Sequence, residues 1–486
     1  MDDETIGYLG ASELVAAYAA GSLTPTEVTA AILRRIEAVD PVINAFCLVD
    51  AEGAMAQAAE STARWRSHQP MGPLDGVPAT VKDLIDARGW PTLKGSLTID
   101  PAGPWENDAP VVARLREAGA VLLGKTTTPE FGWRGSTDSA LTGITRNPWR
   151  LDRTPGGSSG GAVAALAAGL GPLGLGTDGG GSIRIPAAFT GTVGIKAQFG
   201  RVPAHPHSPM GTVAHVGPQA RSVRDCALML GVLAGADDRD WLALPGPAPD
   251  WVASVDQVLA RGSEGKPLAA MRIGFSPRLK HARYVDPRIE AALVAAAKRL
   301  EELGAVVEQA DPDIPDGEHA FRVHWFSSAR QLLHRLPSEK FELLDPGLRD
   351  VVEQAAGYTL ADFLDAQAVR ATIASGMAQY TRRFDLLLTP ATAVLPFEVG
   401  LYAPARPAEL GVGADHDWTW WTPFSWPFNL SQQPAIVLPC GFSDDGLPIA
   451  MQLVAPKHRE DACFRAAAAY EAATDWGRRR PAFMPS

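Results

Sequence analysis

Three serines in one glycine-rich stretch, Thr154–Pro186, are the residues of this 486-residue chain best suited to chemistry. Ser158 and Ser159 lie in the sequence GGSSGG, and Ser182 follows consecutive glycines. Glycine lacks a Cβ, so it exposes main-chain N–H groups and lets the backbone approach a ligand closely. Acyl transfer needs a hydroxyl nucleophile beside such donors, because they stabilise the oxyanion that forms. A single Gly-Gly-Ser is more often a turn, but the repetition here predicts an acyl-transfer site.

Ser182 is the serine that we predict to be the nucleophile. The N–H groups of the preceding Gly179, Gly180 and Gly181 would form an oxyanion hole with its own, and each such donor contributes about 3–4 kcal/mol in the transition state. A serine hydroxyl also needs a base. Lys82 ends an apolar segment, and burial would lower its pKa and leave a neutral amine that can accept a proton. The alternative for such a lysine is a surface position with only its stem buried.

The sequence around these residues resembles the amidase signature family of serine hydrolases. The blocks GGSSGG at 156–161 and GTDGGGSIRIPA at 176–187 match that family in sequence and spacing, and GVPATVKD at 76–83 resembles its lysine motif. Blocks such as LLGKTTTPEF at 122–131 and NLSQQPAIVLPCG at 429–441 extend the resemblance over nearly the whole chain. The resemblance implies a single domain, residues 1–486, with the amidase signature fold: an α/β/α arrangement of a large twisted mixed β-sheet covered by helices on both faces.

The resemblance also implies a mechanism. Ser158 is expected on a cis peptide bond, where it relays a proton from Ser182 to Lys82, and Ser159 is the alternative relay. Ser182 would attack the carbonyl carbon, the proton would return to the leaving amine, and water would hydrolyse the acyl-enzyme. We expect no cofactor, and no sequence spacing suggests a metal site.

The sequence predicts the substrate in less detail than it predicts the class of reaction. The chain resembles bacterial aryl acylamidase- and urethanase-like members. An aromatic-rich pocket with few cationic residues would favour a small hydrophobic or aromatic amide, anilide or carbamate as the substrate. Phe131 and Trp133 stand where the family often places acyl-pocket residues. Gly179 replaces a larger residue such as Thr or Ile, which could widen the site, and Gln432 replaces a glycine and could reshape it.

The segment WTWWTPFSWPF at 418–428 is the most aromatic part of the chain. Its tryptophans either line an apolar entrance to the site or belong to the core or to a homodimer contact, and we keep both alternatives. These tryptophans are Trp418, Trp420, Trp421 and Trp426.

Composition restricts the partners. The formal net charge of −11 argues against nucleic acid, which is bound by clustered Lys and Arg. No apolar stretch is long enough to span a membrane, no signal peptide is visible, and the four scattered cysteines suggest a reducing compartment, so we expect a cytoplasmic protein. The expected partners are the substrate and water, with a homodimer as one arrangement.

The elements that must position these residues alternate between strand and helix, which indicates an α/β fold with a parallel or mixed sheet. We predict strands at 76–82, 120–123 and 384–390, and a thin alanine-rich helix at 162–169. Capping residues predict a helix that starts at Thr24 and stops at Asp40-Pro41. The segment 238–267 is predicted to be a surface excursion, or lid, and 319–383 a mostly helical insert.

Two sequence patterns would suggest nucleotides, and we discount both. The P-loop match at 119–126 spans a predicted strand rather than a loop, so an ATPase is disfavoured. The G-x-G-x-x-G match at 174–179 needs a helix directly after it, and we expect IRIP at 183–186 not to begin one. The remaining alternatives are the amidase subunit of a tRNA-dependent amidotransferase and a non-catalytic binding protein on the same fold.

Overall fold

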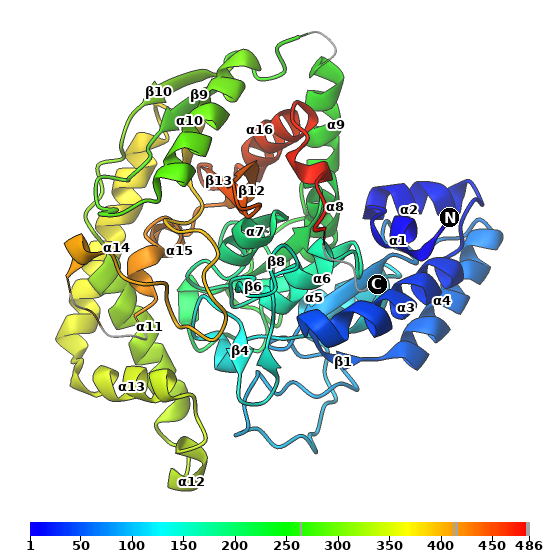
Figure 1. The fold of residues 1–486 in the computed structure, drawn as a ribbon, viewed down its shortest axis with the longest axis horizontal. Helices are drawn as coiled ribbons and strands as arrows, with labels where there is room; N and C mark the ends of the chain where they lie inside the picture. The colour runs from blue at the N-terminus through cyan, green and yellow to red at the C-terminus, as the bar shows by residue number, and fades with distance from the viewer. Residues whose placement is uncertain (263–264, 412, 414–416, 483–486) are drawn as a thin grey trace.

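A computed structural model describes residues 1–262, 265–411, 413 and 417–482. Its centre is a mixed sheet of eleven strands with helices on both faces (Figure 1), in agreement with the predicted α/β/α fold. In spatial order the strands are β1 (Phe46–Val49), β3 (Val121–Thr126), β2 (Pro78–Lys82), β6 (Leu173–Asp178), β8 (His215–Ala220), β7 (Val193–Lys196), β12 (Ala435–Phe442), β13 (Pro448–Val454), β11 (Leu386–Pro390), β9 (Arg272–Phe275) and β10 (Val306–Gln309). A separate hairpin pairs β4 (Asp138–Ser139) with β5 (Gly143–Ile144).

The helices form groups around this sheet. Helices α1–α4 lie on the opposite side of the molecule from α11–α14, and α8, α9 and α16 lie together (Figure 1). None of the helices in the described ranges is long and apolar enough to cross a membrane. The helices are α1 (Asp3–Gly7), α2 (Ala11–Ala19), α3 (Pro25–Ile43), α4 (Ala51–Arg66), α5 (Pro110–Glu117), α6 (Gly160–Ala167), α7 (Arg184–Thr190), α8 (Val223–Leu233), α9 (Trp251–Gly262), α10 (Pro287–Glu302), α11 (Glu318–Leu333), α12 (Ser338–Phe341), α13 (Pro346–Gln354), α14 (Leu360–Tyr380), α15 (Trp426–Leu430) and α16 (Glu460–Ala472).

The neighbouring strands β2 and β6 run parallel, so their carboxyl ends meet at one edge of the sheet. Strand β2 ends at Lys82 and β6 ends at Asp178, directly before the glycine loop. Helix α6 starts immediately after Ser159, and every one of its residues is buried. Its alanines and glycines make it thin, which lets both serines lie close to the sheet.

The expectation that no helix begins at 183–186 is wrong, because α7 starts at Arg184 and contains Pro186. Proline is tolerated in a first helical turn, where the N–H groups have no intrahelical partner. No phosphate site results, because a carboxylate of the chain already occupies this helix end. Asp178 Oδ2 accepts the N–H groups of Ile183 at 3.2 Å and Arg184 at 3.4 Å.

The predicted stop at Asp40-Pro41 is also wrong, since α3 continues to Ile43 and ends at Asn44 in the left-handed conformation. Pro41 lies in the last turn, so the helix loses only one backbone hydrogen bond there.

The predicted surface excursion and the predicted helical insert both contain helices. Residues 238–267 include α9, which contacts α8 and α16. Asp240, Trp241 and Leu242, which precede that helix, line a cavity that Ser158 and Ser182 also line. Residues 319–383 consist largely of α11–α14. That 238–267 acts as a lid, and that the whole chain forms a single domain, remain predictions.

Candidate active site

Lys82 lies at the end of β2 with no exposed surface and contacts three hydroxyl groups. Its Nζ lies 2.7 Å from Ser158 Oγ, 2.9 Å from Ser159 Oγ and 2.8 Å from Thr177 Oγ1. Ser158 follows a cis peptide bond from Gly157, as the resemblance implied. The alternative of a surface lysine is therefore wrong at this position.

The hydrogen bonds of Ser159 indicate how protons are arranged around the amine. Ser159 Oγ donates to the carbonyl oxygen of Thr177 at 3.3 Å, so it can only accept from Lys82. A neutral amine has two N–H donors and one lone pair. If these donors go to Ser159 and Thr177, the lone pair is left for the hydroxyl proton of Ser158. The geometry therefore suits Lys82 to act as a base toward Ser158.

Burial favours the neutral form of this amine. It holds the pKa of Lys82 well below its ordinary value, and the negative charge of Asp178 opposes that shift only in part. The adjacent Asp83 does not pair with Lys82. Its carboxylate lies 3.2 Å from Lys125 Nζ instead, because successive residues of a strand point to opposite faces.

Ser182 lies on the glycine loop and lines the same cavity as Ser158 and Thr177. The loop is attached to the serine pair by a hydrogen bond of 3.2 Å from Ser159 N–H to the carbonyl oxygen of Ser182. Gly181 N–H donates to Asp178 Oδ1 at 2.9 Å and so is already used. Among the residues that the structure describes, the N–H groups of Gly179, Gly180 and Ser182 have no protein acceptor and can bind an oxyanion.

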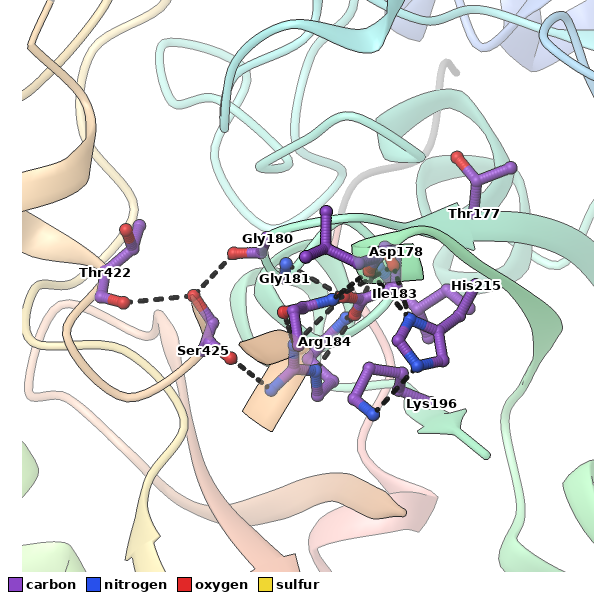
Figure 2. Close-up of polar contacts among 12 residues, drawn as sticks. Thr177, Asp178, Gly180, Gly181, Ile183, Arg184, Lys196, His215, Thr422 and Ser425 are labelled. Carbon is purple, nitrogen blue, oxygen red and sulfur yellow. Dashed lines mark hydrogen bonds and ion pairs between the residues drawn. The ribbon is translucent and has the colours of Figure 1, made fainter. Parts of the chain in front are cut away.

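Asp178 and Arg184 form a buried ion pair beneath this loop (Figure 2). The Asp178 carboxylate accepts from Arg184 Nη2 at 2.9 Å and from the Asn429 amide at 2.8 Å. Burial raises the pKa of Asp178, but Arg184, Lys196 and Asn429 outweigh that effect and hold it below its ordinary value. Sequence reasoning did not single out this pair. The signal was one acidic and one basic residue within an otherwise uncharged glycine-rich block.

His215 contacts this network and also lines the cavity, and its ring is neutral. Its Nδ1 lies 2.9 Å from the carbonyl oxygen of Val213 and 3.2 Å from that of Asp178, so Nδ1 carries the proton. Its Nε2 then accepts from Lys196 Nζ (Figure 2). Burial and the charge of Lys196 keep the pKa of His215 well below its ordinary value. His215 therefore has both ring nitrogens engaged away from Ser182, which agrees with a lysine base.

A cavity of about 440 Å³ opens over the three hydroxyl groups of Ser158, Thr177 and Ser182. Phe131 lines it, as predicted for a pocket residue. Trp133 does not line it, since it is fully buried and packs its ring against Tyr402. Other apolar lining residues include Leu84, Ile85, Val111, Val202, Met210, Trp325 and Leu332, and the charged residues Asp86, Lys94 and Asp240 line it as well.

The tryptophans of 418–428 do not line this cavity. Trp418, Trp421 and Trp426 are buried in the core and Trp420 is half-buried, so the core alternative holds for three of the four. Gly179 also leaves no empty space, because the ring of Trp325 packs against it. Gln432 adopts a positive φ of 64° and donates to the carbonyl oxygen of Thr212.

Comparisons with known proteins agree on one family. The family model described as Amidase matches residues 27–464. The chain is 36% identical over 496 residues to an acylamidase of Rhodococcus erythropolis, and the match covers 99% of each chain. It is 37% identical over 495 residues to a glutamyl-tRNA(Gln) amidotransferase subunit from Roseiflexus castenholzii, and that match covers 95% of each chain.

Solved structures give the same result for the fold. A bacterial aryl acylamidase of the amidase signature family matches with a TM-score of 0.88 and 31% identity over 98% of each chain. A 6-aminohexanoate cyclic dimer hydrolase matches with a TM-score of 0.87 and 30% identity, over 98% of this chain and 99% of that one.

Proposed function

Because the chain belongs to the amidase family, and is thus a hydrolase of amide C–N bonds, we propose that it cleaves a small hydrophobic or aromatic amide, anilide or carbamate through an acyl-enzyme on Ser182. The observation that carries the proposal is the contact of 2.7 Å between a buried lysine amine and Ser158 Oγ, under a cavity that Ser182 also lines. The apolar side chains around that cavity favour a hydrophobic substrate.

The proposed reaction has two halves. Lys82 takes the proton of Ser158, which takes that of Ser182 as its oxygen attacks the carbonyl carbon. The N–H groups of Gly179, Gly180 and Ser182 bind the oxyanion. The proton returns through Ser158 to the leaving nitrogen as the C–N bond breaks. Water then attacks the acyl carbonyl carbon and its proton passes through Ser158 to Lys82. As the ester bond breaks, that proton returns through Ser158 to Ser182 Oγ, and the acid is released.

A second candidate is the amidase subunit of a tRNA-dependent amidotransferase, since the Roseiflexus castenholzii relative is a protein of that kind and is equally similar. Such a subunit would hydrolyse glutamine only in the presence of its partners. The largely apolar lining favours the free-standing hydrolase, whereas the charged lining residues Asp86, Lys94 and Asp240 are the ones that could pair with the two charges of glutamine.

The test is a hydrolysis screen of the purified chain with p-nitroanilides, aryl carbamates, primary amides and glutamine. In parallel, a fluorophosphonate probe reports whether a serine is nucleophilic. We expect the chain to hydrolyse at least one hydrophobic substrate of the screen and to be labelled by the probe. Ser182→Ala should abolish the labelling and should have the same melting temperature as wild type. Glutaminase activity that requires added partners would favour the amidotransferase, and a folded chain with neither labelling nor turnover would be a binding protein.

A further inference from the structure

Trp325 places an aromatic ring against the glycine loop that precedes Ser182. It lies on α11, is 3% exposed and lines the cavity together with Gly179 and Ser182. Its indole N–H donates to the carbonyl oxygen of Trp133 at 3.2 Å, which holds the ring in one orientation. The small exposed part of the side chain therefore faces the space in which the substrate would bind.

The glycines of the loop leave room for aromatic rings that pack directly against the backbone. A Cβ added to Gly179 would lie 2.6 Å from Cζ3 of Trp325, and one added to Gly180 would lie 2.6 Å from Cζ of Phe321. Both distances are shorter than carbon atoms tolerate without displacement. Trp325 thus occupies the volume that a side chain at 179 would need, and either the ring or a larger residue can be present, but not both.

Two neighbouring aromatic rings pack against the indole ring of Trp325. Phe321, one helical turn earlier on α11, stacks on it with centroids 5.8 Å apart and planes at 22°. Trp418 meets it edge to face at 5.8 Å. Ser425 Oγ donates to the carbonyl oxygen of Gly180 at 2.6 Å, which holds the loop from its other side (Figure 2). The ring and the loop are therefore fixed with respect to each other before any substrate binds.

We propose that Trp325 is a specificity-determining residue, whose ring is the flat wall on which a planar group next to the scissile carbonyl packs, and that Gly179 admits it. The inference rests on the proposed function and narrows its substrate class to amides with an aromatic ring beside the amide group. A planar ring can stack or lie edge-on against an indole, and a puckered ring of the same size cannot approach as closely.

The test compares flat and puckered substrates of equal ring size. Benzamide against cyclohexanecarboxamide probes the acyl side, and acetanilide against N-cyclohexylacetamide probes the amine side. The intrinsic reactivity of each substrate cancels when its kcat/KM is compared between variants. For Trp325→Leu we expect the flat-to-puckered ratio of at least one pair to fall about three- to tenfold, the worth of one aromatic pair. Trp325→Phe should keep the ratio.

The matched control is Trp420→Leu, the same change at a half-buried tryptophan outside the cavity, which should leave both ratios unaltered. The second arm is a double-mutant cycle. Gly179→Val alone should suppress both turnover and fluorophosphonate labelling, and the same change in the Trp325→Leu background should cost much less.

Labelling by the fluorophosphonate probe distinguishes a failure of the proposed function from a failure of the inference about Trp325. If wild type is folded but unlabelled, the proposed function is wrong. If wild type is labelled at Ser182, the inference is overturned when Trp325→Leu changes neither ratio by threefold, or when the two substitutions at 179 and 325 act additively.

Discussion

Lys82 Nζ and Ser158 Oγ lie 2.7 Å apart in a part of the protein where neither side chain is more than 1% exposed. Burial without a direct carboxylate partner favours the neutral form of the Lys82 amine over the hydrated, charged form. The same burial brings the amine into contact with three hydroxyl groups at the carboxyl ends of β2 and β6. In the proposed mechanism this neutral amine is the base that accepts the proton of Ser158.

The pH dependence of turnover follows from that base. Lys82 acts only when unprotonated, so kcat/KM should rise with pH through the lowered pKa of Lys82 and level off above it. Asp178 stays ionised across this range because its pKa is below the ordinary value. The profile should be recorded from pH 5 to 10, and Lys82→Arg should lose at least about 100-fold at every pH. A rate that falls as pH rises from 5 to 8 would contradict a lysine base.

Ser158 and Ser159 should respond differently to loss of their hydroxyls. Ser158→Ala removes the relay and should lower kcat by about 100-fold or more. Ser159→Ala removes one acceptor and should lower kcat by about tenfold or less.

The pH profile separates the two variants further. Charged Lys82 can donate to three hydroxyls and the neutral amine to only two, so losing an acceptor destabilises the charged form more. The acid limb of Ser159→Ala should therefore move to lower pH than that of wild type. Equal losses in the two variants would argue that Ser159, not Ser158 alone, carries the proton.

The ion pair beneath the glycine loop should be essential for stability. Asp178→Asn leaves the fully buried Arg184 without its counter-charge and should lower the free energy of unfolding by about 3–5 kcal/mol. Urea denaturation followed by tryptophan fluorescence measures this loss. Asp152→Asn, which breaks an ion pair with Arg150 at the surface, is the matched control and should change the midpoint little. Similar midpoints for both variants would refute the structural role of the pair.

Glu471 should make the fold more stable in mild acid than in mild base. Burial, with a smaller contribution from the charge of Asp225, raises the pKa of Glu471 to about 8, and the Val223 N–H opposes that rise. The folded state therefore holds a proton that the unfolded state has released, so the free energy of unfolding should fall from about pH 5 to 9, by on the order of 1–3 kcal/mol.

Glu471→Gln tests this assignment, because the amide keeps an acceptor for Val223 N–H, which lies 3.0 Å from Glu471 Oε1, and cannot ionise. Urea unfolding at pH 5, 7 and 9 should show a flatter dependence for this variant than for wild type. A variant as pH-dependent as wild type would assign the effect to another group.

The amino-acid sequence was sufficient for the fold class, and it singled out Lys82, Ser158 and Ser182, of which the structure brings Lys82 and Ser158 into contact and places Ser158 and Ser182 on one cavity. These are encoded locally, by glycines beside serine and by an apolar run that ends in lysine, and the resemblance to a family supplied the rest. The oxyanion donors were predicted as a continuous set. Only the structure shows that Gly181 N–H is already bound to Asp178.

Tertiary structure decided what surrounds those residues. The pairing of Asp178 with Arg184, the burial of Trp133 away from the cavity and the packing of Trp325 on Gly179 all depend on contacts between elements distant in the chain. Residue types and their local sequence indicate which reaction a residue can take part in, because reactivity depends on the side chain and on the backbone beside it. Which side chain forms the wall of a pocket depends on how α11 packs against the loop after β6, and packing distances of this kind have no periodic signature in the sequence.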